Sequence, residues 1–211
     1  MYKEEYPSTL LENAVDAIHS LPGVGRRSAL RLALHLLKQD KESVHQFTGA
    51  INALCDNVCY CRECGMISDS DLCSICSDGG RLHNQLCVVE SVQDVMSIEN
   101  TGQYKGVYHV LGGIISPING TAPSDLAIPQ LKERLERLCA NSQAQNIEVI
   151  FALPADVEGE TTSFYIYRQI SQYGVTVTTL ARGLGFGDAL QYADALTLGR
   201  SIASRQPFQQ R

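Results

Sequence analysis

Four cysteines form two Cys-x-x-Cys pairs, Cys61/Cys64 and Cys73/Cys76, with eight residues between the pairs. At this separation the four thiolates can occupy the corners of a tetrahedron around one zinc ion. Four soft ligands leave no open coordination position, so we expect the site to be structural. The segment has few large apolar side chains, and zinc binding would supply the free energy that folds it. A redox dithiol at either pair is the alternative interpretation.

Neighbouring residues leave the ligand set partly open. Cys55 and Cys59 are four residues apart on an expected helix, and we interpret them as packing residues. His83 lies downstream and is a further potential ligand. Eight cysteines would also suit disulfides in a secreted chain, but residues 1–5 lack the basic-then-apolar form of a signal peptide. No run of about 18 apolar residues occurs. We therefore expect a cytoplasmic protein with a metal site and no membrane contact.

A second informative segment is Leu21-Pro22-Gly23-Val24-Gly25, which Arg26 and Arg27 follow. An apolar helical pattern ends at Pro22, and another helix begins after the two glycines. Uncovered glycine N–H groups and the positive end of the next helix can bind an anion. Arginine is disfavoured at that end of a helix, so the two arginines indicate phosphate as their missing partner. A helix-hairpin-helix grips the nucleic-acid backbone in this way without reading bases. An ordinary helix-turn-helix corner is the alternative.

The helices around this hairpin carry a local basic patch. Between Arg26 and Glu42 five arginines and lysines oppose two acidic residues, although the whole chain of 211 residues has a net charge of −6. A general basic surface is therefore excluded, and any DNA contact must come from this patch. The candidate DNA-binding residues are Gly23, Gly25, Arg26, Arg27, Arg31 and Lys38. A third helix, 44–59, is expected to pack on the first two with Phe47, Ile51, Leu54 and Cys55 inward.

From residue 86 onwards strands and helices alternate, which predicts a parallel sheet with helices on its faces. The apolar runs indicate strands at 86–90, 106–111, 147–153 and 175–180. Helices are expected at 92–100, 131–140 and 161–173, the second with Leu131, Leu135, Leu138 and Cys139 inward, and a long loop at 116–129. The fold class is thus multidomain α/β.

Carboxylates gather where this sheet would bind a ligand, beyond the carboxyl ends of its strands. Glu90 ends the first strand, Asp94 follows it, and Asp156, Glu158 and Glu160 follow the third strand. Three interpretations stay open: a Mg²⁺ site for phosphoryl transfer, an acidic surface for a basic protein partner, or side chains that favour a helix N-terminus.

The last segment is a glycine-rich turn, 182–188, before a helix expected at 189–205. The turn lacks the Lys-Ser/Thr of a P-loop, and we expect a structural turn more than a nucleotide site. Residues 206–211 form a polar tail.

Taken in order, these motifs closely resemble the RecR family of bacterial recombination mediators over essentially the whole chain. Besides the hairpin and the four cysteines, the matching strings are Cys87-Val88-Val89-Glu90, Tyr108-His109-Val110-Leu111, Ser116-Pro117, Glu158-Gly159-Glu160-Thr161, Asp194 and Thr197-Leu198. The resemblance implies a helix-hairpin-helix domain at 1–58, a C4 zinc finger at 59–82, a Toprim domain at 83–180 and a C-terminal Walker-B-like segment at 181–211.

The resemblance also implies a function. Members of the family form ring-like tetramers that encircle DNA and work with RecO, and in some organisms RecF, to help RecA load at single-stranded gaps. The inner-ring basic positions fall on Arg27 and Arg31, and the Toprim carboxylates on Glu90, Asp94, Glu158 and Glu160, where they are associated with RecO binding.

This chain departs from the family pattern at Gly185-Phe186, Ala189-Leu190 and Ala195, which weakens a catalytic Walker-B role. A non-enzymatic DNA-binding scaffold is therefore our first hypothesis, with structural zinc as its cofactor. The alternatives are a Mg²⁺-dependent phosphoryl-transfer enzyme that uses the Toprim carboxylates and a zinc-ribbon transcription adaptor.

Overall fold

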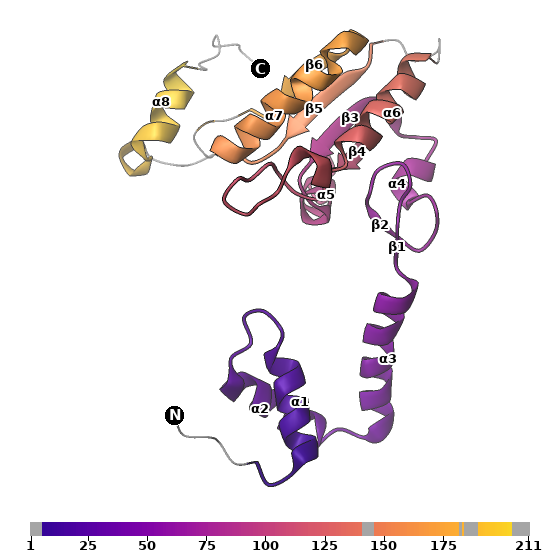
Figure 1. Cartoon of the computed structure of the whole chain (residues 1–211), viewed down its shortest axis with the longest axis vertical. Helices are drawn as coiled ribbons and strands as arrows, with labels where there is room; N and C mark the ends of the chain where they lie inside the picture. The colour runs from indigo at the N-terminus through magenta and orange to yellow at the C-terminus, as the bar shows by residue number, and fades with distance from the viewer. Residues whose placement is uncertain (1–5, 141–145, 182, 184–189, 204–211) are drawn as a thin grey trace. The chain divides into compact units, whose positions relative to one another are not determined.

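The computed structural model of the chain describes residues 6–140, 146–181, 183 and 190–203. These residues form two compact units that divide between Val58 and Cys59, and each unit is described by itself (Figure 1). None of the described helices has the length and apolar character needed to cross a bilayer.

The first unit consists of three helices, α1 (Thr9–His19), α2 (Arg26–Leu36) and α3 (Lys41–Asn57). Ser8 and Asp40 cap α1 and α3, because their side chains accept hydrogen bonds from backbone N–H groups in the first turn, at 3.2 Å from Leu10 and 2.9 Å from Ser43. Helices α1 and α2 pack against each other around a small buried core of Val15, Ala29 and Ala33.

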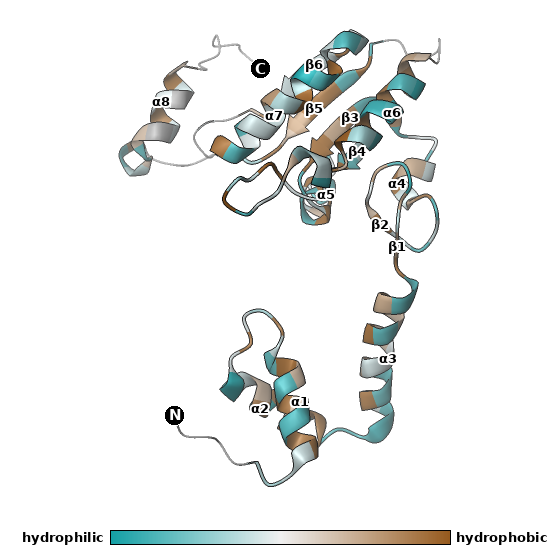
Figure 2. Cartoon of the chain, in the orientation of Figure 1, coloured by the Kyte–Doolittle hydropathy of each residue, from teal (hydrophilic) through white to brown (hydrophobic). Residues whose placement is uncertain are grey.

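The third helix does not pack as the sequence predicted. None of its residues is buried, and the three large apolar side chains expected inward are about half exposed: Phe47 at 52%, Ile51 at 47% and Leu54 at 60%. Cys55 is exposed as well, which contradicts its interpretation as a packing residue. The periodicity correctly identified one apolar side of this helix, visible as brown turns in Figure 2, but nothing in the described unit covers it.

The second unit is built on a four-stranded parallel sheet, as predicted. Its strands are β3 (Leu82–Val89), β4 (Gly106–Val110), β5 (Glu148–Ala152) and β6 (Thr176–Thr179), in the order β4-β3-β5-β6. All three pairings are parallel. The central strands β3 and β5 therefore end at the same edge of the sheet.

Helices cover both faces of the sheet, which explains why the strands read as continuous apolar runs. Successive residues of β3 point to opposite faces: Leu86 and Val88 join one buried cluster, and Cys87 and Val89 join another. The first cluster includes side chains from α6 (Ile128–Ala140) and α7 (Val157–Ile170), and the second includes Val95 from α5 (Val92–Glu99). The three helices are seen around the sheet in Figure 1.

Short elements complete the unit. Strands β1 (Cys59–Tyr60) and β2 (Ile67–Ser68) pair antiparallel, and α4 (Ser74–Ser77) follows them. The 3₁₀ helices are η1 (Pro123–Asp125), η2 (Ser171–Tyr173) and η3 (Leu190–Tyr192), and α8 (Ala195–Ala203) is the last helix. Asp194 accepts a 2.9 Å hydrogen bond from the N–H of Thr197 and so caps α8.

Several predicted boundaries need correction. The helix expected at 161–173 begins at Val157, so Glu158 and Glu160 lie in its first turn and not in a loop. The helix expected from residue 131 begins at Ile128, and Cys139 on it is exposed rather than inward. The helix expected at 189–205 begins only at Ala195, after the 3₁₀ helix η3. The glycine-rich turn, apart from Gly183, and the tail lie outside the described residues.

Candidate functional site

The four predicted cysteine ligands lie together. Their sulfur atoms are all within 4.8 Å of one another, and Cys61, Cys64 and Cys73 are buried. Cys61 and Cys64 come from the turn between β1 and β2, whereas Cys73 caps α4 and Cys76 lies within it. The turn between β1 and β2 and the short helix α4 with its N-cap thus supply two sulfurs each. We call residues 59–77 the knuckle.

The arrangement fits a zinc ion. Tetrahedral zinc with Zn–S bonds of about 2.3 Å needs sulfur atoms about 3.8 Å apart. The Sγ atoms of Cys64 and Cys73 are 3.6 Å apart, and the Cys73 Sγ accepts a 3.4 Å hydrogen bond from the N–H of Cys76. A hydrogen bond from the Cys64 thiol and the positive charge of Arg134 lower the pKa of Cys76 to about 6. A lowered pKa favours the thiolate, which is the form that binds metal.

The other flanking candidates do not join this cluster. The Cys59 thiol donates to the backbone oxygen of Ser68 at 3.1 Å, and the His83 ring contacts the backbone oxygen of Asp78 at 3.1 Å. Among the described residues, the four cysteines are the only set of three or more Cys, His, Asp or Glu side chains close enough to share a metal ion.

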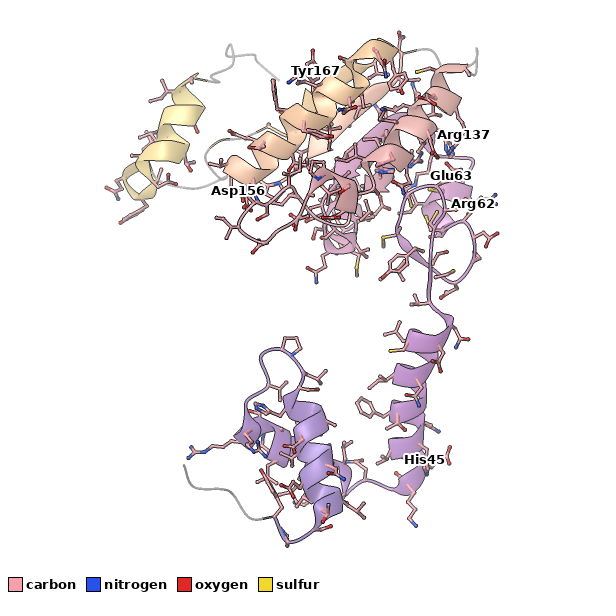
Figure 3. All side chains as sticks on the ribbon, in the orientation of Figure 1. His45, Arg62, Glu63, Arg137, Asp156 and Tyr167 are labelled. Carbon is pink, nitrogen blue, oxygen red and sulfur yellow. The ribbon has the colours of Figure 1, made fainter. Side chains whose placement is uncertain are left out.

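The knuckle is held against the sheet by contacts that the sequence did not reveal. The backbone N–H of Val110 on β4 donates a 2.7 Å hydrogen bond to the carbonyl of Cys64. Arg134 on α6 is buried and donates to the carbonyls of Glu63, at 3.1 Å, and Tyr108, at 2.6 Å. Arg137, one turn further along α6, pairs with the Glu63 carboxylate at 2.8 Å (Figure 3). The buried guanidinium of Arg134 on α6 therefore connects the knuckle with β4, the edge strand of the sheet.

Only one of the two hairpin glycines has a backbone conformation that other residues rarely adopt, because Gly25 is extended with φ −73°. Gly23 has φ +79°, a left-handed conformation that other residues rarely adopt. Gly25 is the N-cap of α2, and no side-chain hydrogen bond caps the first N–H groups of this helix. The His19 ring lies 2.8 Å from the carbonyl oxygen of Val24 and ties the end of α1 to the turn. Sequence reasoning missed this contact.

The predicted basic residues divide into two groups. Arg26 has partners within the unit: it pairs with Asp16 at 2.9 Å and lies over the Tyr6 ring, 5.9 Å from its centroid. The inference that Arg26 lacks an internal partner was therefore wrong. Arg27, Arg31 and Lys38 are exposed and form no ion pair with any residue that the structure describes. These three, with Leu30, Leu34 and His35, line a groove of about 400 Å³ on α2, which we call the α2 groove.

The acidic residues lie where the parallel sheet predicted. Glu90 follows β3, and Asp156 follows the neighbouring strand β5. Burial and the negative charges of Asp94, Asp156 and Glu158 raise the pKa of Glu90, so these carboxylates repel one another.

Three of these acids have structural partners. The Asp94 carboxylate accepts 2.8 Å hydrogen bonds from the N–H and hydroxyl of Ser91, a capping box at the start of α5. Asp156 caps α7 by accepting from the N–H of Gly159 at 2.8 Å. The buried Ser116 hydroxyl donates to Glu158 at 2.6 Å, while Glu160 is exposed in the same helical turn. The helix N-terminus interpretation thus accounts for part of this cluster.

Known protein families match the chain over nearly its whole length. Four family models match in order: RecR helix-hairpin-helix at residues 11–55, the RecR four-cysteine zinc finger domain at 58–78, Toprim domain at 84–181 and RecR C-terminal at 183–206. A protein named Recombination protein RecR from Porphyromonas gingivalis is 50% identical over 97% of this chain and 96% of its own length. Proteins of the same name from Flavobacterium johnsoniae and Bacteroides thetaiotaomicron are each 49% identical over 97% of this chain and 97% of their own length.

The chain belongs to the RecR family. The fold predicted from its motifs is therefore confirmed: helix-hairpin-helix, four-cysteine zinc finger, Toprim-type parallel sheet and a C-terminal RecR region. In the described structure the RecR zinc finger packs on the Toprim sheet through the contacts of Cys64 and Glu63, and both lie in the second unit. The RecR helix-hairpin-helix match lies within the first unit.

Gly159 shows why the RecR string Glu158-Gly159-Glu160 has glycine at its centre. A Cβ added there would lie 2.1 Å from the carbonyl oxygen of Pro154, so only glycine allows the first turn of α7 to pack on the chain that leaves β5. That close approach places Glu158 beside Ser116.

Proposed function

We propose that this protein binds DNA without sequence preference and acts as a non-enzymatic scaffold in recombinational DNA repair in the cytoplasm. The observation that carries the proposal is the α2 groove: Arg27, Arg31 and Lys38 are exposed along it and form no ion pair within the described part of the chain, and Arg27 lies in the uncapped first turn of α2. Cations beside free N–H groups are suited to phosphate, which carries no sequence information. The family name of the relatives, Recombination protein RecR, agrees with this role.

A structural zinc ion fits this role. The residues that would hold it are Cys61, Cys64, Cys73 and Cys76, and when bound it would stabilise the fold of the knuckle. Four thiolates leave no position for substrate, so zinc has no catalytic part in the proposal.

Assembly would explain how an acidic chain holds DNA. We propose a homo-oligomer, a tetrameric ring by resemblance to the family, in which each copy contributes one small basic patch. Several weak contacts to one DNA molecule add through effective concentration.

The acidic edge is the proposed docking surface for a basic partner, RecO by resemblance, with RecF as a further candidate partner in the pathway. Glu90, Asp94, Glu158 and Glu160 are its candidate residues. Glu160 is exposed, so Glu160→Lys should reduce RecO capture while DNA affinity is unchanged. Equal capture by the variant would remove the acidic edge from that interface.

The proposed DNA contact is tested by the salt dependence of binding. Removal of each phosphate contact should flatten the plot of log affinity against log salt by about 0.7–0.9. The Arg27→Ala/Arg31→Ala variant should bind more weakly with a flatter slope. The charge-matched control is Arg62→Ala/Arg168→Ala, since both of these arginines are exposed in the second unit. Equal slopes for the two variants would contradict the proposed contact.

The enzymatic alternative has its own test. The protein and its Glu158→Ala variant are assayed for turnover of DNA or ATP with Mg²⁺. Turnover by the parent protein that the variant lacks would overturn the scaffold proposal, because phosphoryl transfer would then depend on a Toprim carboxylate.

A further inference from the structure

The floor of the α2 groove is apolar, although its rim is basic. Leu30 and Leu34 lie between Arg27, Arg31 and Lys38, and the Leu34 side chain is 43% exposed. Residues three and four apart share one side of a helix, so the mixture of Arg27, Leu30, Arg31 and Leu34 follows from their spacing along α2, and Lys38 lies just beyond its end. The groove is therefore an apolar strip bordered by cations.

Phosphate binding alone does not account for this floor. A phosphate needs charge and hydrogen-bond donors, and an exposed leucine offers neither. In duplex DNA the flat base faces are stacked on one another, and the outer surface presents phosphates and sugars. In an unpaired strand the base faces are free, and proteins bind them on apolar or aromatic side chains while cations follow the backbone.

We propose that the α2 groove is built for an unpaired DNA strand: Arg27, Arg31 and Lys38 bind phosphates, and Leu34, beside Leu30, contacts a base face. This inference rests on the proposed DNA-binding function and adds the form of DNA and a base-contacting residue. The charge complementarity between the basic rim and a polyanion selects nucleic acid as the occupant, and the apolar floor selects a strand with free bases.

The chain offers a matched pair of positions for the test. Leu32 and Leu34 lie on the same helix and are each 43% exposed, but Leu32 does not line the groove. The chain contains no tryptophan, so a tryptophan introduced at either position is the only indole in the molecule. The variants Leu34→Trp and Leu32→Trp are prepared in the full chain, and their fluorescence is followed on addition of single-stranded oligonucleotide, duplex of the same length, or inorganic polyphosphate.

Single-stranded DNA should quench the indole of L34W and leave that of L32W unchanged, because only the first can stack on a base. Duplex and polyphosphate should leave both unchanged at saturation. The L34W variant should also bind the single strand about fivefold more tightly than L32W does, since an indole stacks better than a leucine.

Equal quenching of L34W by duplex and single strand, or no quenching by either, would overturn the inference. A native mass of L34W that differs from that of L32W before DNA is added would do so too, because Leu34 would then contact another copy. Failure of the proposed function is distinguished by Arg27→Ala/Arg31→Ala: if this variant loses DNA affinity while L34W stays unquenched, the DNA contact stands and the base contact is wrong.

Discussion

The two units bury their apolar residues to very different extents. The first unit has three buried core residues, and it leaves Leu10 81% exposed and Leu37 73% exposed. In the second unit, one face of the sheet alone supports a buried cluster of fourteen residues, and the other face has its own cluster. Both units expose some large apolar side chains, but only the sheet unit has a large buried core, with one cluster on each face of its sheet.

The difference shows how each unit is held together. The helical unit depends on the α1–α2 contact, on the caps Ser8 and Asp40 and on the Arg26–Asp16 pair. The sheet unit depends on packing, and within it the knuckle would depend on bound metal and on Arg134. Substitutions of similar chemistry should therefore have unequal effects in the two units.

The largest effect is expected at the knuckle. Replacement of Cys61 or Cys73 by serine should abolish zinc binding, since each supplies one of four ligands. Zinc sites of this kind bind with about 10–16 kcal/mol, and most of that free energy would no longer support the knuckle. Metal analysis should find about one zinc per chain in the parent protein and none in these variants.

The matched control is Cys55→Ser, because Cys55 is exposed on α3 in the helical unit. It should retain zinc and an unchanged melting temperature. Full zinc content in C61S and C73S would mean that the ligands are wrongly assigned.

The next effect contrasts two leucines. Leu135 is fully buried between α6 and the sheet, and Leu135→Ala should lower the free energy of unfolding by about 2–5 kcal/mol. Leu54 on α3 is 60% exposed, and Leu54→Ala should change it by at most about 0.5 kcal/mol. Denaturant unfolding measures both. A large loss for L54A would show that α3 is covered in the native assembly.

A third effect depends on pH. His109 on β4 is buried, with Nε2 2.7 Å from the carbonyl oxygen of Ala127, and burial lowers its pKa from 6.5 to about 4. Between these values the unfolded chain binds a proton that the folded chain does not, so stability falls as pH falls from 6.5 towards 4. The loss should reach about 3 kcal/mol.

Unfolding measured across this pH range should show the loss in the parent protein and a flatter profile in His109→Gln. The exposed His45 on α3 is the control, and His45→Gln should keep the parent profile (Figure 3). An unchanged profile in H109Q would assign the acid sensitivity to other groups.

The smallest effect concerns the acidic edge. Burial first, and then the charges of Asp94, Asp156 and Glu158, raise the pKa of Glu90 above its ordinary value of 4.5. Its ionised form therefore opposes folding at neutral pH, and Glu90→Gln should stabilise the sheet unit by at most about 0.5 kcal/mol. The gain should vanish as pH falls below 4.5.

Asp40 in the helical unit should behave in the opposite way. The backbone N–H of Ser43 lowers its pKa below 3.8, so its ionised form stabilises the start of α3 and that contribution is lost only as pH falls through the lowered pKa. Asp40→Asn should therefore destabilise the protein at neutral pH. Melting curves of Glu90→Gln and Asp40→Asn at two pH values compare the two effects.

The sequence predicted what depends on local patterns. The strand at Leu86 to Val89 was visible as an apolar run, and the rule for parallel sheets placed Glu90 near Asp156 because β3 and β5 are neighbours. Two Cys-x-x-Cys pairs were enough to bring four sulfurs together, since each pair is a short local turn.

The contacts that were missed depend on distant chain segments. Arg134 binds the carbonyl of Tyr108, and a backbone carbonyl leaves no trace in the sequence. The error at Phe47, Ile51 and Leu54 has another origin: helical periodicity shows which side of a helix is apolar but not what will cover it.

The hydrogen bonds made to β4 also affect whether this sheet can pair with a strand of another chain. Strand β4 is buried along its length yet stands last in the order β4-β3-β5-β6, and a bare apolar edge strand is a template for β-strand addition by another chain. Three hydrogen bonds occupy the open side of β4. The carbonyl of Cys64 accepts one from the N–H of Val110, Arg134 donates one to the carbonyl of Tyr108, and Arg81 donates one to the carbonyl of Gly106 at 3.3 Å. Loss of the zinc ligands is therefore expected to free the N–H of Val110 at this edge, and an unpaired edge group of this kind favours strand pairing with another chain.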